Sequence, residues 1–421
     1  MDILQEILNN EVYPAFGCTE PISIAYACAN ASKLIKKIDR DITITLNIDP
    51  GTYKNGYGVN IPKLNNEKGN LIAAAVGALI PHPELKYNIF SKATTEKIKQ
   101  AKKIIEEKRI KINVDYTKKD IYIEAIIRNS KDKAVCILSK SHFNISLLML
   151  NDKIITSQTT KDKKTDYKEI IKNMTLKDLI ELAKNATPKQ LEYLKKGIEM
   201  NLKASKEGFK LKKTGYWLKK LSQNDVINNI KSIAASATDA RMAGLPLTVM
   251  SSGQSGNQGI VAILVPYFYG KHAGIKEEKI LKSIALSHII NSYIKSYTGE
   301  LAPICGCAIS SGTGASAAIV YQQFPEDISK IAGAINNVLA DIGGLICDGA
   351  KESCSLKVAS SVESAIKNAY LAINSVIVDK NSGFIEEDPL KTIKNMARLS
   401  IIGMGSVDSI IIEMMQNKIS N

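Results

Sequence analysis

The amino-acid sequence predicts an α+β fold in two parts. A mixed α+β N-terminal domain covers residues 1–215, and a mostly α-helical C-terminal domain covers residues 216–421. Residues 109–157 alternate apolar and polar side chains repeatedly, which is typical of half-buried antiparallel strands. From Val226 onward, apolar residues recur with helical spacing between loops rich in glycine and serine. The length of 421 residues fits two or three domains and allows a sizeable core.

The first domain is expected to mix helices and strands. Helical patterns cover residues 1–9, 21–38, 70–80, 91–108 and 176–206. Residues 41–48 have the spacing of a strand, and residues 109–157 are expected to form several antiparallel strands joined by polar turns. Residues 49–60 form a glycine-rich stretch, and residues 158–167 are predicted to be a surface loop. In the second domain, residues 251–259 and 310–314 are predicted to be loops between alanine-rich helices.

Composition excludes several classes of protein. The net charge of +14 comes from 56 basic and 42 acidic residues, and such a surplus can mark a nucleic-acid binder. Here the lysines are spread along the chain in pairs, and the aromatic residues, only 6%, are not interleaved with arginine, so nucleic-acid binding is not expected. No apolar run approaches the ~18 residues of a membrane helix, and the acidic start lacks the basic segment of a secretory signal. We therefore expect a cytoplasmic protein that does not bind membranes.

The seven cysteines point to chemistry rather than to disulfides. Their number is odd, and four of them lie close together in the last third of the chain, as Cys305, Cys307, Cys347 and Cys354. The spacings do not match the paired Cys-x2–4-Cys knuckles of zinc sites. Gly349 suggests a loop that folds Cys347 back toward a helix carrying Cys354, so that two segments could hold one iron–sulfur cluster. Spacing alone leaves a cluster, zinc, and structural or redox thiols open.

The segment Gly17-Cys18-Thr19-Glu20-Pro21 places a thiol beside a hydroxyl and a carboxylate. Pro21 can be the first residue of the following helix. The free N–H groups and positive dipole end of that helix are expected to lower the pKa of Cys18 and could hold a substrate carboxylate. The alternative interpretation is a capped helix with a buried thiol.

Residues 251–259 read Ser-Ser-Gly-Gln-Ser-Gly-Asn-Gln-Gly. Hydroxyls, amides and exposed backbone N–H groups without charge can bind small anions, carboxylates included. The segment matches neither the phosphate-binding loop of nucleotide hydrolases nor the dinucleotide fingerprint. A flexible linker is the alternative.

Four segments together resemble the L-cysteine desulfidase family, which is related to the iron–sulfur L-serine dehydratases. They are residues 11–21, residues 253–259, Cys305-Gly306-Cys307 and residues 347–357, and they occur in the order of the family along essentially the whole chain. The resemblance implies an oxygen-sensitive [4Fe–4S] enzyme that works without pyridoxal phosphate and splits L-cysteine into sulfide, ammonia and pyruvate. It also implies that the C-terminal half is like the serine dehydratase alpha domain, with the 17–21 loop lying over the cluster.

On this reading Cys305, Cys347 and Cys354 are the cluster ligands, with Cys307 an alternative to Cys305. Three thiolates would leave one iron open as a Lewis acid suited to a sulfur leaving group. Cys18 is then either a fourth, displaceable ligand or an acid–base group. The substrate-binding residues are expected to be Thr19, Glu20, Ser252, Ser255, Asn257 and His288.

Lys351 and His288 also have alternative roles, and the remaining cysteines are not expected to belong to the site. Lys351 is either the base for the Cα proton or a cation that neutralises the cluster. His288 lies on an apolar helix, where a lone histidine is more often a core residue. Cys28 and Cys136 lie in helix and strand patterns and are expected to be core thiols.

Other functions remain in competition. The same chemistry could remove hydroxide from L-serine, which would make the protein an iron–sulfur L-serine dehydratase. A pyridoxal enzyme would need a Schiff-base lysine with a pyridinium partner and a phosphate loop, a set that the sequence does not provide. A basic iron–sulfur binding or sensor protein is a remote alternative. The substrate is therefore expected to be a small amino acid, and a homo-oligomer is compatible with the sequence.

Overall fold

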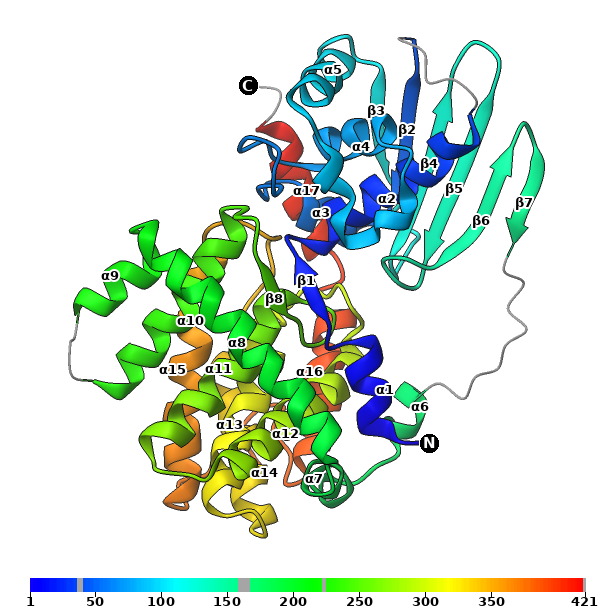
Figure 1. Ribbon diagram of the computed structural model, residues 1–421. Helices are drawn as coiled ribbons and strands as arrows, with labels where there is room; N and C mark the ends of the chain where they lie inside the picture. The colour runs from blue at the N-terminus through cyan, green and yellow to red at the C-terminus, as the bar shows by residue number, and fades with distance from the viewer. Residues whose placement is uncertain (36–40, 158–166, 222–224, 419–421) are drawn as a thin grey trace.

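The computed structural model describes residues 1–35, 41–157, 167–221 and 225–418 (Figure 1). An α/β body, blue to cyan, lies at the top of Figure 1, and a helical body, green to orange, lies below it. The predicted α+β class is therefore confirmed. No single described helix is long and apolar enough to cross a membrane, although the bent pair Pro389–Gly403 and Val407–Asn417 passes on length and composition.

The α/β body contains one sheet of six strands in the order β3-β2-β4-β5-β6-β7. Their bounds are β2 (Thr43–Ile48), β3 (Ile110–Val114), β4 (Tyr122–Arg128), β5 (Lys133–Ser139), β6 (Ile145–Leu150) and β7 (Lys153–Ser157). Strands β4 to β7 form an antiparallel meander, as predicted. Strand β3 instead pairs parallel to β2, because helices between them form the crossover that a parallel pair needs.

Helices cover one face of this sheet. They are α2 (Thr19–Leu34), α3 (Pro50–Gly56), α4 (Asn70–Leu79), the 3₁₀ segment η1 (Pro83–Lys92) and α5 (Thr95–Glu106). Helix α2 begins at Thr19 rather than at the predicted Pro21, and Cys18 is its N-cap residue. Helix α3 lies in the glycine-rich stretch of residues 49–60. It forms because Asp49 accepts a hydrogen bond from the Thr52 N–H at 2.8 Å and Pro50 opens the first turn.

The helical body is built from twelve of the described helices. They are α1 (Ile3–Asn10), α6 (Tyr167–Lys172), α7 (Leu176–Lys184), α8 (Pro188–Lys210), α9 (Thr214–Leu221), α10 (Val226–Met242), α11 (Gly256–His272), α12 (Glu277–Thr298), α13 (Ile309–Gln323), α14 (Ile328–Ile342), α15 (Cys354–Ile373) and α16 (Pro389–Arg398). The cores do not divide at the predicted boundary near residue 215. The apolar residues of α1 and those of residues 171–204 pack into the helical core. Most of the predicted loop 158–167 lies outside the described residues.

The predicted loop at residues 310–314 is wrong, because these residues lie inside α13. Their small side chains serve helix packing instead. A Cβ on Gly314 would lie 2.4 Å from the Ser287 carbonyl oxygen of α12, so glycine allows the two helices to cross closely.

Contacts made by segments near both ends of the chain join the bodies. Strand β1 (Pro14–Phe16), just before Cys18, pairs antiparallel with β8 (Thr248–Met250) of the helical body. After the π-helical turn η2 (Leu399–Gly403), helix α17 (Val407–Asn417) returns to the α/β body, where its Ile412 joins the core. Asp408 of α17 forms an ion pair of 2.5 Å with the buried Lys54 of α3. Both ends of the chain therefore fix the two bodies against each other.

Candidate active site

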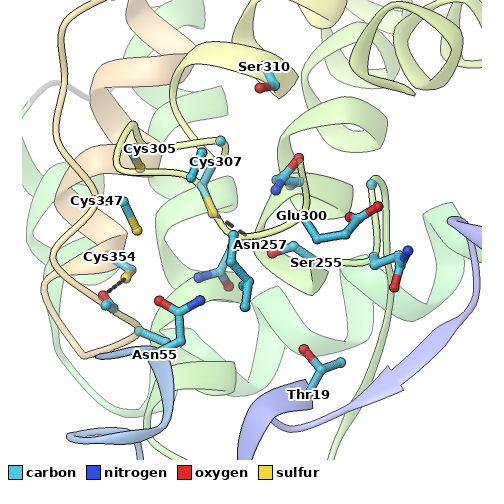
Figure 2. A pocket seen from close by; sticks show the side chains of 18 of the residues that line it. Thr19, Asn55, Ser255, Asn257, Glu300, Cys305, Cys307, Ser310, Cys347 and Cys354 are labelled. Carbon is cyan, nitrogen blue, oxygen red and sulfur yellow. Dashed lines mark hydrogen bonds between the residues drawn. The ribbon is translucent and has the colours of Figure 1, made fainter. Parts of the chain in front are cut away.

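A pocket lies where the two bodies meet. It is lined by the start of α2, by α3, by the turn between β5 and β6, and by Arg241 of α10. The helical body adds side chains from within the segments 253–258, 300–307 and 347–357, most of which are loops and helix N-termini (Figure 2). The pocket is therefore assembled from segments far apart in the sequence.

Five of the seven cysteines line this pocket: Cys18, Cys305, Cys307, Cys347 and Cys354. In Figure 2, Cys305, Cys347 and Cys354 lie along one side, and Cys307 points toward Ser255. The Cys307 sulfur lies 3.9 Å from the Ser255 hydroxyl oxygen.

The other two cysteines lie elsewhere. Cys28 and Cys136 are fully buried in the core of the α/β body, where they neighbour each other. Their prediction as core thiols is confirmed.

Backbone pairing brings the two cysteine segments together. Ile304 and Ile346 form an isolated antiparallel bridge. The Cys305 N–H donates to the Leu345 carbonyl at 2.8 Å, and the Cys347 N–H donates to the Pro303 carbonyl at 2.6 Å. The thiols of the two segments therefore face the same pocket.

The loop after Cys347 turns at Gly349, as predicted, and Cys354 is the first residue of α15. Gly349 has a φ of +91°, a conformation that residues with a side chain rarely adopt. A Cβ at this position would lie 2.3 Å from the Lys54 carbonyl oxygen, so the loop rests directly on α3.

The cysteines form an electrostatically coupled group. A hydrogen bond with Cys307, followed by burial, raises the pKa of Cys305 well above its ordinary value. Burial raises the pKa of Cys347, and Cys305 adds to the effect. Burial, with smaller contributions from Cys305 and Cys347, raises the pKa of Cys354 to about 12. These thiols are therefore neutral unless a positive charge enters the pocket.

The chemistry of this donor set fits an iron–sulfur cluster. No three histidine, cysteine, aspartate or glutamate side chains of the described residues are arranged around a single metal ion. A cubane cluster does not require that, because each thiolate binds a different iron. Cys305, Cys347 and Cys354 would hold it, and the charge of the bound iron would ionise their thiols.

Cys18 does not have the lowered pKa expected from its sequence. Its thiol donates a hydrogen bond to Glu20 Oε2 at 2.8 Å. Burial and the Glu20 carboxylate together raise the pKa of Cys18 well above its ordinary value, although Arg241 opposes the shift. The helix N-terminus was expected to dominate, but burial of the thiol and the carboxylate two residues away outweigh it.

Glu20 connects three of the side chains around it. It accepts hydrogen bonds from Cys18 and from the Asn55 amide, the latter at 3.1 Å, and its Oε1 lies 4.0 Å from His142 Nε2. Burial alone would raise the pKa of Glu20, but His142 and these hydrogen bonds lower it below its ordinary value. Glu20 is therefore a carboxylate at neutral pH, held at the edge of the pocket.

Arg241 holds the loop that precedes α2 against the start of α11. Its guanidinium donates to the Gly17 carbonyl at 2.9 Å and to Asn257 Oδ1 at 3.1 Å. Asn257, predicted to contact substrate, therefore uses its oxygen to orient the arginine. Ser255 is the N-cap residue of α11 and makes no side-chain cap bond, so apart from the contact with the Cys307 sulfur its hydroxyl is available beside the helix N-terminus.

A group of buried charges lies on another side of the pocket. Lys295 donates to the Glu300 backbone carbonyl at 2.5 Å, and Lys168 pairs with the Glu300 carboxylate. Burial lowers the pKa of Lys295. Burial opposes ionisation of Glu300, but Lys295 and Lys168 lower its pKa below the ordinary value. Glu300 Oε2 is buried without a hydrogen-bond partner, so this carboxylate can still accept a donor.

The structure brings most of the predicted residues to the pocket. The predicted residues that line it are Cys18, Thr19, Glu20, Ser255, Asn257, Cys305, Cys347 and Cys354. Three predicted residues are not among the lining residues. Ser252 and His288 bond to each other at 2.8 Å behind the 253–258 loop. Lys351 pairs with Asp348 and donates to its carbonyl at 2.9 Å.

Sequence reasoning missed several lining residues: Lys54, Asn55, His142, Arg241, Gln258, Lys295 and Glu300. Arg241 and Lys295 are charged residues within otherwise buried helical stretches, which is a signal that the sequence carries. His142 lies in a short turn between strands, where no local pattern marks it.

Comparison with known proteins agrees with this architecture. Residues 84–413 match the serine dehydratase alpha chain family. A UPF0597 protein of Elusimicrobium minutum is 49% identical over 425 residues, covering 100% of both chains. A UPF0597 protein of Geobacter sulfurreducens is 43% identical over 427 residues, covering 99% of both.

The chain thus belongs to the serine dehydratase alpha chain family and, within it, groups with the UPF0597 proteins. The predicted relationship to the iron–sulfur serine dehydratases is confirmed. The family indicates a lyase of the dehydratase type with an iron–sulfur cluster.

The contact between Gly349 and α3 gives a first prediction. Gly349→Ala should lower both iron content and the melting temperature, because its Cβ would displace the cysteine loop from α3 and strain a left-handed residue. Gly344→Ala is the matched control, since nothing lies within 4 Å of its Cβ. Equal iron content in the two purified variants would contradict the role given to this contact.

Proposed function

We propose that the protein is a [4Fe–4S]-dependent L-cysteine desulfidase, a carbon–sulfur lyase that converts L-cysteine to sulfide, ammonia and pyruvate. The observation that carries the proposal is the pocket in which four clustered thiols meet a thiol–carboxylate pair, Cys18 and Glu20, from the other body. β-Elimination needs a soft Lewis acid for a sulfur leaving group, an acid–base system, and contacts for an amino acid.

The cluster would supply an open iron that polarises the bond between Cβ and sulfur. All other steps fall to side chains of this chain. Because the Cys18 thiol is protonated, it can donate a proton to the departing sulfur, and Glu20 orients that thiol.

The pocket matches the two charges of an amino-acid substrate. Ser255 and the free N–H groups at the start of α11 can bind a carboxylate, as helix N-termini do. Glu300 Oε2 has no hydrogen-bond partner, although Lys295 Nζ lies 3.9 Å away, and it can accept a hydrogen bond from the substrate ammonium. Together these contacts would orient Cβ toward the cysteine cluster and Cα toward the α/β body.

L-serine is the alternative substrate. The family match favours it, since the matched family is that of serine dehydratases. The lining favours cysteine at one point, because the pocket wall formed by Cys305, Cys307, Cys347 and Cys354 is rich in sulfur.

Anaerobic reconstitution with iron and sulfide tests the proposal. The loaded protein should release pyruvate faster from L-cysteine than from L-serine at equal concentration, and exposure to air should abolish both activities. Pyruvate from L-serine alone would establish the dehydratase instead. Pyruvate from neither, with a full complement of iron, would refute the proposal.

Cluster ligation is tested by replacing single cysteines. Cys347→Ala and Cys354→Ala should each remove most of the iron and its visible absorbance, since a lost thiolate opens a ligand position. Cys28→Ala and Cys136→Ala are controls that should keep the iron, because both thiols lie in the distant core. Comparing Cys305→Ala with Cys307→Ala identifies the third ligand, and full retention of iron in both would exclude that segment.

Cys18→Ser should reduce turnover by about 10²–10⁴-fold, the usual contribution of a positioned acid. Iron content should change little, because Cys18 stands on the α/β body while the other thiols stand on the helical body. Turnover and iron by absorbance are measured on one preparation. Near-normal turnover would make Cys18 structural, and complete loss of iron would make it an obligatory ligand.

A further inference from the structure

The turn between β5 and β6 carries a histidine into the pocket. His142 is 4% exposed and stands at the point where the α/β sheet meets the helical body. Its Nε2 is buried and has no hydrogen-bond partner. Since a buried polar atom without a partner is costly, this nitrogen calls for an explanation.

The other ring nitrogen fixes the tautomer. His142 Nδ1 lies 3.2 Å from Gln254 Oε1, and an amide oxygen only accepts hydrogen bonds. The neutral imidazole therefore carries its proton on Nδ1 and leaves a lone pair on Nε2. Nε2 lies 4.0 Å from Glu20 Oε1.

Gln254 makes this contact from a strained backbone conformation. Its φ is +62°, which is unfavourable for a residue with a side chain. Its N–H donates to the Glu11 carbonyl at 3.2 Å, and its own carbonyl accepts from Tyr13 Oη at 3.5 Å. Residues that their surroundings hold in a strained backbone conformation are frequent at active sites, which supports a positioning role for Gln254.

Acidic groups surround the ring. The carboxylates of Glu20, Asp49 and Glu300 come from three separate segments, and each interacts electrostatically with His142.

The other basic groups that line the described pocket are already committed. Lys54 pairs with Asp408 at 2.5 Å, Lys357 pairs with Asp348, and Lys295 bonds the Glu300 carbonyl. The Cys18 thiol is protonated and points to Glu20. His142 Nε2 is the basic atom left with an available lone pair.

We propose that His142 is the base that removes the Cα proton of the substrate, with Gln254 as the residue that positions it; this rests on the proposed elimination. The bond between Cα and hydrogen breaks, and the proton goes to Nε2. The electron pair forms the double bond between Cα and Cβ as the leaving group departs with the pair of its own bond. Solvent water then hydrolyses the aminoacrylate, as its imine, to pyruvate and ammonia, with no oxidant or reductant.

His142→Asn tests the assignment, because the asparagine amide nitrogen can replace Nδ1 toward Gln254 while the atom at Nε2 is lost. The loaded variant should turn over about 10²–10⁴-fold more slowly than wild type. Its iron content and the absorbance change on adding L-cysteine should be unchanged. Deuterium at Cα of the substrate should slow the variant more than the wild type, since breaking the Cα–H bond becomes rate-limiting. His272→Asn, at an exposed site, is the control.

A second measurement needs neither cluster nor activity. The chain has four histidines, so protein labelled with ¹⁵N-histidine gives few imidazole signals, and His142→Asn assigns the one of interest. At mildly alkaline pH we expect a protonated Nδ1 and a bare Nε2. A proton on Nε2 with a bare Nδ1 would overturn the proposal.

The outcomes separate the two claims. If wild-type enzyme eliminates neither L-cysteine nor L-serine, the proposed function fails and the base assignment fails with it. If wild type eliminates and His142→Asn is near-normal, only the base assignment is overturned. A parallel loss of iron and turnover in His142→Asn, or an unchanged isotope effect at a reduced rate, would make the residue structural or substrate-binding and would also overturn it.

Discussion

The pocket depends on direct contact between the α/β body and the loop that joins Cys347 to Cys354. Gly349 lets the loop touch the Lys54 carbonyl of α3, and no side chain separates them. On the far side, α17 of the C-terminal segment holds α3 through the buried pair of Lys54 and Asp408. Because that ion pair is nearly closed to water, losing either partner would leave a buried charge uncompensated. The cysteines are thus enclosed only while the two bodies stay docked.

Burial in the pocket determines whether the thiols are protonated. Burial raises the pKa of Cys347 and Cys354, and nearby sulfur atoms raise it further, so protons stay on sulfur in the protein alone. Lys54 and Lys357 work in the opposite direction at Cys347, but they do not overcome burial. Binding of a cationic metal centre reverses the balance, since the thiolate form becomes the stable one. Loading of the cluster and docking of the bodies are therefore expected to stabilise each other.

Much of the fold was predictable because it is local. The strand alternation of residues 109–157, the turn at Gly349 and the helical C-terminal half all follow from patterns of neighbouring residues. The parts that failed are those set by distant contacts. Residues 310–314 look like a loop, yet Gly314 is required by a helix crossing with Ser287. The strand pairing of β1 with β8 joins two three-residue segments more than 200 residues apart, and no local pattern marks it.

The site shows the same limit. Motifs identified the cysteines and the Cys18–Glu20 pair, because unusual residue types recur there within a few positions. The pKa of Cys18 could not be deduced, since it depends on whether burial and Glu20 outweigh the helix N-terminus. His142 could not be identified from the sequence, because its neighbours Gln254 and Glu20 are brought to it only by the fold.

In the proposed function, the two bodies divide the chemistry between them. The helical body would supply the soft sulfur ligands and the N-terminus of α11. The α/β body would supply the groups that handle protons, with Cys18 and Glu20 at the start of α2 and His142 on a turn of the sheet. An elimination in which a proton leaves Cα while sulfur leaves Cβ requires both sets on opposite sides of the substrate. Neither body holds a complete site, so catalysis is tied to the docking that also encloses the thiols.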